Sequence, residues 1–193
     1  MGIIGKLIAN FCAFFLAINI LGQLIAFLSI SEQMQPKQAR KTLLNSAYFI
    51  FFVSLVIMFI GWILSALTGI RPVDMQISGG VLLLAFAVLA LIRPDEEISI
   101  VKDSTFFPVT AQLIVTPVFF IMLLVLMSLN GFIITALSLF LNLLVVIYFF
   151  INSSKIVGLV GPGGIRTISR IVNILICSYA VMLIRVAITA MFS

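Results

Sequence analysis

The chain has no histidine, few charged residues and only two cysteines. The absence of histidine removes the commonest metal ligand and proton carrier from any mechanism. Only 9% of the 193 residues are charged, whereas a water-soluble domain carries roughly 25%. Cys12 and Cys177 lie in apolar segments without the C-x-x-C spacing of redox or zinc sites, so we expect both to be small core residues. These shortages argue against histidine- or cysteine-based chemistry.

Hydrophobic residues make up 63% of the chain, which is typical of an integral membrane protein. The net charge of +5 comes from basic residues that are spread through short loops rather than gathered in one patch. Loop residues of this kind set the orientation of a membrane protein, so they do not indicate a nucleic-acid partner. The partner that the composition implies is the lipid bilayer.

Six apolar stretches are long enough to cross a bilayer, for which about 20 mostly apolar residues are needed. They are Leu7–Ile30, Leu43–Leu67, Val73–Ile92, Phe106–Leu129, Phe132–Ile151 and Ile171–Phe192. Asn130-Gly131 predicts a tight turn between the fourth and the fifth. Gly161-Pro162-Gly163-Gly164 predicts a flexible turn before the sixth, and it lacks the Gly-Lys-Ser/Thr ending of a phosphate-binding loop. We therefore expect an all-α membrane protein with six transmembrane helices.

The orientation follows from the basic residues of the loops. The loops after spans one, three and five contain Lys37, Arg40, Lys41, Arg93, Lys102, Lys155, Arg166 and Arg170. The other side has only Lys6 and Arg71. Because the more basic side faces the cytoplasm, both termini are expected to lie outside.

Polar and helix-weakening residues interrupt the first and the fourth stretch near their middle. Asn19-Ile20-Leu21-Gly22-Gln23 lies in the first, and Leu113-Ile114-Val115-Thr116-Pro117 lies in the fourth, offset by 94 positions (116 − 22). In lipid, freed backbone groups are tolerated only where they are buried in protein or line a watery cavity. We therefore expect helices one and four to be broken near mid-membrane.

Each half of the chain would hold three spans, so the second half would insert upside down relative to the first. The sequence thus predicts two inverted three-helix repeats, residues 1–95 and 96–193, in one membrane domain. Broken helices at equivalent positions of inverted repeats are typical of transporters with a central binding site.

Three stretches resemble the MarC family, also called the neutral amino acid transporter family. They are Asn19-x-x-Gly22, the segment from Gly69-Ile70 to Ile77-Ser78-Gly79-Gly80-Val81-Leu82-Leu83, and Gly164 with Ile168-Ser169-Arg170-Ile171. Asp103 with Pro108 also resembles the family's aspartate and proline before span four. The resemblance runs through nearly the whole chain and implies a multi-pass protein of the bacterial or archaeal inner membrane.

Two of the family's motifs are altered in this chain. The family usually reads Asn-Pro-x-Gly-x-x-Pro in span one, and here Ile20 and Ile25 replace both prolines. In span four the family's Gly-Pro-Gly becomes Thr116-Pro117-Val118. The resemblance therefore implies a divergent carrier of small neutral amino acids such as glycine and alanine, driven by an ion gradient.

The candidate substrate-binding residues are polar, helix-weakening or charged positions inside the spans. They are Asn19, Gly22, Gln23, Gln112, Thr116, Pro117, Asn173 and Arg185. Other roles stay open, namely close helix packing at Gly22, interhelical hydrogen bonds at Asn19 and Gln23, and a simple kink at Pro117.

Arg185 also has three open readings: its side chain could reach the outer interface, pair with Asp74, or bind a substrate carboxylate. Gly79 and Gly80 predict a small-residue packing surface that would let the broken first span approach closely. Asn142 predicts a hydrogen bond between helices. These last three residues are candidates for structural support of the site.

The sequence favours a secondary transporter of a small molecule that works by alternating access. Since no acid or histidine lies deep within the spans, sodium coupling or uncoupled export fits better than a protonated side chain, and apart from a coupling ion (Na+ or H+) we expect no cofactor. An enzyme would depend on Asp95-Glu96-Glu97 with Asp103, which lack a partner base, so we expect no enzyme. The alternative is a non-transporting scaffold or regulatory subunit, which would have continuous first and fourth spans.

Overall fold

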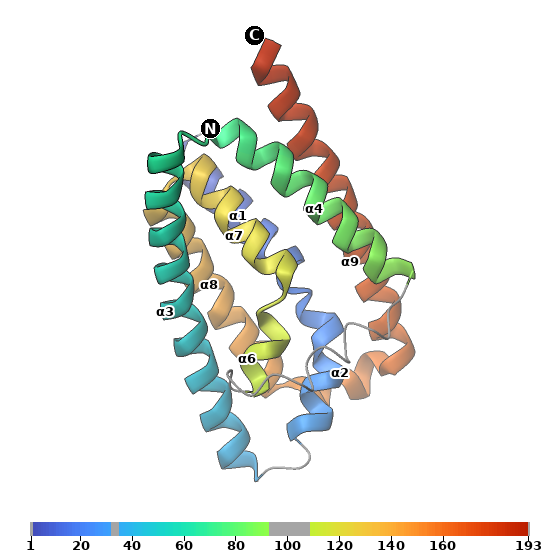
Figure 1. Cartoon of the computed structure of the whole chain (residues 1–193). Coiled ribbons are helices and arrows are strands. Elements are labelled where there is room, and N and C mark those ends of the chain that lie inside the picture. Colours follow the sequence, from blue (N-terminus) through green and yellow to red (C-terminus); the bar gives the residue numbers. More distant parts are fainter. Residues whose placement is uncertain (1, 32–34, 93–108, 193) are drawn as a thin grey trace.

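The computed structural model of the protein describes residues 2–31, 35–92 and 109–192, and these contain helices but no strand. In chain order the helices are α1 (Ile3–Ile18), α2 (Ile20–Ser31), α3 (Pro36–Thr68), α4 (Pro72–Ile92), α6 (Val109–Ile114), α7 (Pro117–Asn130), α8 (Phe132–Ile151) and α9 (Ser153–Phe192). Figure 1 shows one bundle, with α1 and α7 lying between the pair α3–α8 and the pair α4–α9. The prediction of an all-α protein is confirmed for the described residues.

Four helices, α3, α4, α8 and α9, are long and apolar enough to cross a membrane. A fifth span forms if α1 and α2, which meet at a bend of 42°, cross together. The predicted fourth span corresponds to α6 and α7, of 6 and 14 residues, and its first three residues lie outside the described part. The structure thus provides four to five membrane spans of the six that the sequence predicts.

Prolines and glycines set several helix ends. Pro36 opens α3 at a position where its missing N–H would have no intrahelical acceptor. Gly69 ends the same helix with φ 72°, a left-handed conformation that glycine adopts without strain. Gly131, with φ 85°, separates α7 from α8, which confirms the tight turn predicted at Asn130-Gly131.

Two helices differ in extent from the predicted spans. The turn expected over Gly161-Pro162-Gly163-Gly164 corresponds to a kink at Gly161 (φ 74°, ψ 156°), which joins two helical segments within α9. Pro162 can follow directly, since a proline is tolerated in the first turn of the helix that resumes there. α3 also begins at Pro36, ahead of the predicted Leu43, because polar residues extend this helix beyond its apolar part.

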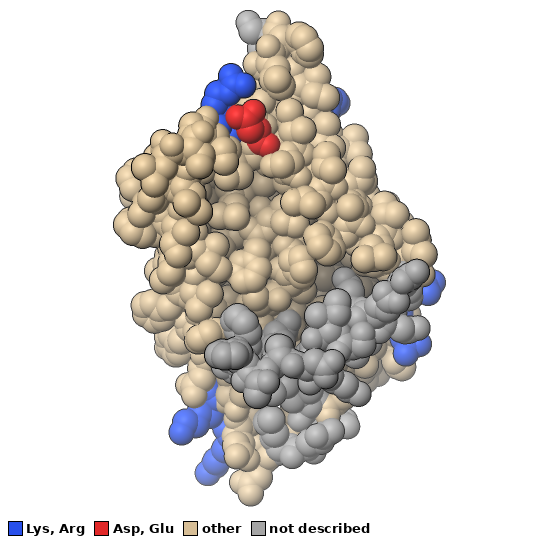
Figure 2. All heavy atoms as spheres, in the orientation of Figure 1, with Lys and Arg blue, Asp and Glu red and all other residues tan. Residues whose placement is uncertain are grey.

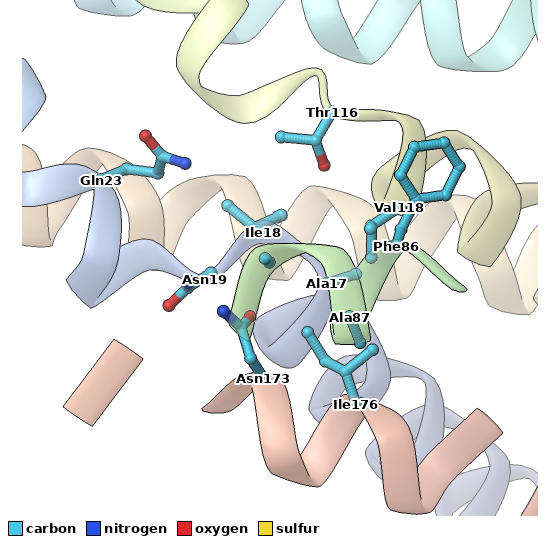
Figure 3. Close-up of a pocket in the computed structure, with 11 residues that line it drawn as sticks. Ala17, Ile18, Asn19, Gln23, Phe86, Ala87, Thr116, Val118, Asn173 and Ile176 are labelled. Carbon is cyan, nitrogen blue, oxygen red and sulfur yellow. The ribbon is translucent and has the colours of Figure 1, made fainter. Parts of the chain in front are cut away.

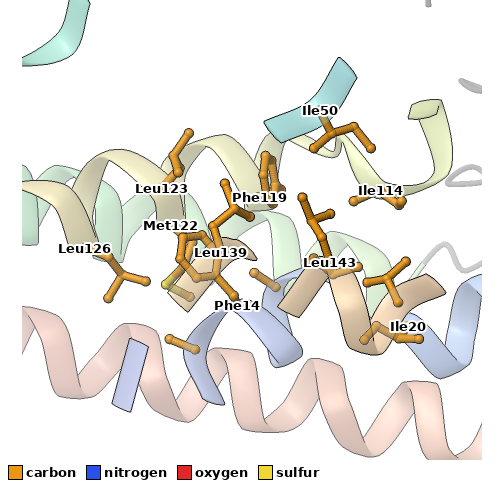
Figure 4. Close-up of a cluster of buried hydrophobic side chains, with 14 of the residues drawn as sticks. Phe14, Ile20, Ile50, Ile114, Phe119, Met122, Leu123, Leu126, Leu139 and Leu143 are labelled. Carbon is orange, nitrogen blue, oxygen red and sulfur yellow. The ribbon is translucent and has the colours of Figure 1, made fainter. Parts of the chain in front are cut away.

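Large apolar side chains lock the centre of the bundle. The rings of Phe14 on α1 and Phe119 on α7 lie 6.0 Å apart, and neither residue is exposed. Figure 4 shows these rings among Met122, Leu123 and Leu139, so that α1, α7 and α8 share one core. This packing holds the end of α1 close to the start of α7.

The outer surface is also apolar. Phe52, Trp62, Ile133 and Tyr148 all expose large side chains. In Figure 2 the middle of the visible face carries few charges, and Lys and Arg lie toward the ends of the bundle. An apolar belt of this kind is suited to lipid. Cys12 is exposed on this surface, so its predicted place in the core is wrong.

Candidate functional site

The break in the first span lies at Asn19, three residues before Gly22. Asn19 adopts the left-handed conformation (φ 47°, ψ 50°), which asparagine tolerates better than most residues. Its N–H donates to the carbonyl of Leu16 at 3.0 Å, and its carbonyl accepts from the N–H of Gln23 at 3.2 Å. The chain therefore ends α1 and starts α2 within one residue.

Gly22 lies in the first turn of α2 and makes room for a contact with α9. The Nδ2 of Asn19 donates to the Oγ of Ser169 at 2.7 Å. A Cβ at Gly22 would lie 2.6 Å from that Oγ and 2.8 Å from that Nδ2. A glycine is therefore needed here for the hydrogen bond that joins the break to α9.

The second break lies between Ile114 and Pro117. Thr116 has an extended backbone, and its Oγ1 accepts from the N–H of Phe119 at 3.2 Å, which caps α7. Pro117 occupies the first turn of α7. The N–H of Thr116 donates to the carbonyl of Ile114 at 3.1 Å, which closes the end of α6. The Thr-Pro pair thus ends one helix and starts the next.

The two breaks meet at one small cavity of about 20 Å³ (Figure 3). Its polar lining residues are Asn19, Gln23, Thr116 and Asn173. Its apolar lining residues are Ala17, Ile18, Phe86, Ala87, Ala90, Val118 and Ile176. This volume has room for about one water molecule. Four of the eight candidate residues therefore lie around a single small cavity.

Helix N-termini and a helix C-terminus meet at this cavity. α2 and α7 start at the cavity, and the first N–H groups of a helix lack intrahelical acceptors. α1 ends at the cavity, and the last carbonyls of a helix lack intrahelical donors. The helix dipoles make the free N–H groups at helix starts attractive to anions and the free carbonyls at helix ends attractive to cations. The cavity thus has N–H groups that suit the anionic group of a zwitterion and carbonyls that suit its cationic group.

Buried polar atoms at the cavity are unpaired. The Oδ1 of Asn19 is buried and has no hydrogen-bond partner among the described residues. The side chain of Asn173 is 6% exposed and likewise makes no hydrogen bond within the described part of the chain. A buried acceptor left unpaired costs about 1–3 kcal/mol. Both side chains are therefore available to a polar ligand.

The remaining candidate residues lie elsewhere. Gln112 belongs to α6, and its side chain is outside the described part of the structure. Arg185 is exposed on α9 and does not line the cavity. Its expected partner Asp74 instead accepts from the backbone N–H of Arg71 at 2.9 Å and forms an ion pair with its guanidinium at 3.5 Å. Of the roles left open for Arg185, the pairing with Asp74 is not realised, because the carboxylate pairs with the closer Arg71.

The glycine pair on α4 packs against helices other than the predicted one. A Cβ at Gly79 would contact Val125 of α7, and a Cβ at Gly80 would lie 3.0 Å from the backbone oxygen of Ala180 on α9. The prediction that these glycines admit the broken first span is therefore wrong. They bring α7 and α9 close to α4, and Phe86, Ala87 and Ala90 of α4 line the cavity.

Asn142 joins α8 to α1, since its Nδ2 donates to the carbonyl of Phe11 at 2.8 Å. Ser138 donates to the carbonyl of Leu7 at 3.3 Å, and Asn10 donates to Thr135 at 3.3 Å. These contacts run along the same two helices and hold α1 firmly on α8.

Sequence reasoning missed Ser169 as a member of the site. It lies in the stretch Ile168-Ser169-Arg170-Ile171, but nothing in the sequence places it beside Asn19. The acidic residues Asp95-Glu96-Glu97 and Asp103 lie outside the described residues.

Comparison with known proteins identifies the family. The model of the MarC family integral membrane proteins matches residues 4–192. No curated protein and no solved structure shows a significant match. Because the family match covers nearly the whole chain, which also provides the apolar helices of a membrane protein, this protein belongs to the MarC family of integral membrane proteins.

Proposed function

We propose that the protein is a secondary transporter of small neutral amino acids, such as glycine and alanine, or of similar small metabolites, and not an enzyme. The observation that carries this proposal is the meeting of two interrupted helices at one polar cavity with an unpaired asparagine oxygen. Discontinuous helices at a central site are typical of secondary transporters.

The cavity matches the two ends of an amino acid. The substrate ammonium would donate to Asn19 Oδ1 and to carbonyls at the end of α1. The substrate carboxylate would accept from N–H groups at the start of α2, with Asn173 and Gln23 offering further amide donors. Apolar neighbours such as Ala87 and Val118 leave space only for a small, uncharged side chain.

The cavity must enlarge to accept such a substrate, since about 20 Å³ holds no more than a water molecule. In an alternating-access mechanism this is the closed state. α1 is held on α8 by several hydrogen bonds, whereas the break is held on α9 by the bond between Asn19 and Ser169. We propose that loosening of this single bond, together with separation of α9 from α2, opens the site.

Helix packing supports the predicted inverted repeats of residues 1–95 and 96–193. α1 packs on α8, and its counterpart α6 packs on α3. α4 packs on α7, and its counterpart α9 packs on α2. Contacts exchanged in this way are expected from a two-fold axis in the membrane plane. We propose six spans, with α6 and α7 together as the fourth.

We also propose how the protein is oriented in the membrane. The junction of α2 with α3 and that of α8 with α9 carry Lys37, Arg40, Lys41 and Lys155, so by the positive-inside rule this end would face the cytoplasm. Both termini would then lie outside a bacterial or archaeal plasma membrane. A non-transporting scaffold would instead have continuous helices at both breaks, and neither helix is continuous here.

Transport can be measured in proteoliposomes with labelled glycine and alanine, under sodium and proton gradients imposed separately. We expect accumulation under one gradient, and Gln23→Ala should lower it about tenfold or more, the effect of losing a hydrogen bond to a charged group. Gln38→Ala is the matched control, because Gln38 is exposed in the first turn of α3. Uptake equal to that of empty liposomes under every gradient would refute the amino acid assignment.

A further inference from the structure

A second pocket lies at the end of the bundle where α2 and α8 end and α3 and α9 begin. Its volume is about 430 Å³. Its polar lining residues are Ser31, Arg40, Ser153 and Ser154. Its apolar lining residues are Phe27, Leu28, Ala39, Leu43, Phe150 and Ile151. The pocket is therefore amphiphilic.

The polar side of this pocket suits an anion. Arg40 is exposed and forms no ion pair with any described residue, and no acidic residue occurs among the lining residues named above. Ser153 is only 3% exposed and lines the pocket. Ser153 and Ser154 also begin α9, where N–H groups lack intrahelical acceptors. Arginine, hydroxyl and amide donors together are suited to a phosphate group.

A separate apolar groove lies next along α3 and α8. This groove has a volume of about 310 Å³. It is lined by Leu44, Ala47, Tyr48, Phe51, Phe52, Phe140, Leu143, Leu144 and Ile147. Leu44 follows Leu43 of the pocket on α3, and Ile147 precedes Ile151 of the pocket by one turn on α8. The pocket at the helix ends and the groove thus follow each other along the same helix pair.

We propose that this pocket and groove bind an anionic phospholipid of the adjacent leaflet. Its phosphate would accept from Arg40, Ser153 and the first amides of α9, and an acyl chain would lie in the groove between α3 and α8. Basic pockets between transmembrane helices are suited to anionic headgroups, and each basic residue contributes appreciably to their binding. The site is separate from the central cavity, so it stands whether or not the protein transports amino acids.

The test is native mass spectrometry of the whole protein in detergent, titrated with phosphatidylglycerol or with phosphatidylcholine. We expect wild type to retain phosphatidylglycerol preferentially and Arg40→Gln to weaken its binding about fivefold or more. Lys41→Gln removes the same charge at the next position, is exposed and does not line the pocket. The Lys41→Gln variant should bind phosphatidylglycerol as strongly as wild type does.

Two results would overturn the proposal. Lipid retention that Arg40→Gln leaves unchanged, or that Arg40→Gln and Lys41→Gln weaken equally, would show that the lipid does not bind specifically at Arg40. Glycerol 3-phosphate that binds at the same concentration as the lipid, with the same dependence on Arg40, would identify a soluble anion as the ligand. Thermal unfolding of both variants without lipid verifies that they remain folded.

Discussion

At the scale of single residues, Asn19 combines a backbone role with a side-chain role. Its left-handed conformation ends α1, and its side chain donates to Ser169 while leaving Oδ1 unpaired. Only glycine adopts this backbone conformation as readily, since other residues lose about 1–2 kcal/mol there. Substitution can therefore separate the two roles.

We predict that Asn19→Gly keeps the break and loses substrate binding. The thermal unfolding temperature in detergent should stay close to that of wild type, because an unpaired buried oxygen disappears together with the bond to Ser169. Asn19→Ala should be less stable than Asn19→Gly by about 1–2 kcal/mol, because alanine is strained at φ 47°. Equal stability of the two variants would show that the left-handed backbone is not maintained.

Gly22→Ala should destabilise the protein by about 1–3 kcal/mol despite the better helix propensity of alanine. The new Cβ would press on Ser169 Oγ and Asn19 Nδ2, so at least one of these side chains must shift and their hydrogen bond is weakened. Gly158→Ala on α9 is the control, because a Cβ there meets no atom within 4 Å. The comparison requires only thermal unfolding curves, and identical shifts for both variants would contradict the close approach of α2 and α9.

At the scale of helices, α6 and α7 are separated by a cap rather than by a proline alone. Pro117 removes one donor, but it is the hydroxyl of Thr116 that binds the N–H of Phe119 and defines where α7 begins. The first span is divided without any proline, since Ile20 and Ile25 follow Asn19. A left-handed asparagine and a capped threonine thus produce breaks that meet at the same place.

Thr116→Val should shorten the start of α7 and destabilise the protein by about 1 kcal/mol, because the hydroxyl that caps the helix is lost while the shape is kept. Thr116→Ser keeps the hydroxyl and should remain within a few tenths of a kcal/mol of wild type. Denaturant or thermal unfolding in detergent measures both. A valine variant as stable as the serine variant would show that the cap contributes nothing.

At the scale of the whole molecule, the direction of insertion can be tested on the two ends of α3. Gln38 and Thr68 are both exposed at opposite ends of this helix. In a background in which Cys12 and Cys177 are replaced by alanine, Thr68→Cys should react with an impermeant maleimide in intact cells. Gln38→Cys should react only after the cells are permeabilised. The reverse pattern would place both termini in the cytoplasm.

Much of the fold could be predicted because the bilayer restricts which sequences and backbone conformations can cross it. The long apolar stretches predicted α3, α4 and α8 to within a turn or two, since a helix must pair its own backbone in lipid. The sequence placed a turn at Gly161-Pro162, where α9 is kinked, but it did not show that helical structure continues on both sides of the kink. The neighbours of Gly79 and Gly80 also escaped prediction, since small residues permit close approach without specifying the partner.

The sequence by itself determined that the chain crosses a membrane, that its first and fourth apolar stretches carry interruptions, and which polar residues lie at those interruptions. These are local properties, set by hydropathy and by the backbone preferences of asparagine, threonine and proline. Only the tertiary structure decided that Asn19, Gln23, Thr116 and Asn173 surround one cavity, that Ser169 holds the break, and that Arg185 lies outside the cavity. These are contacts between distant segments, and they depend on how the helices pack against one another, which no local pattern encodes.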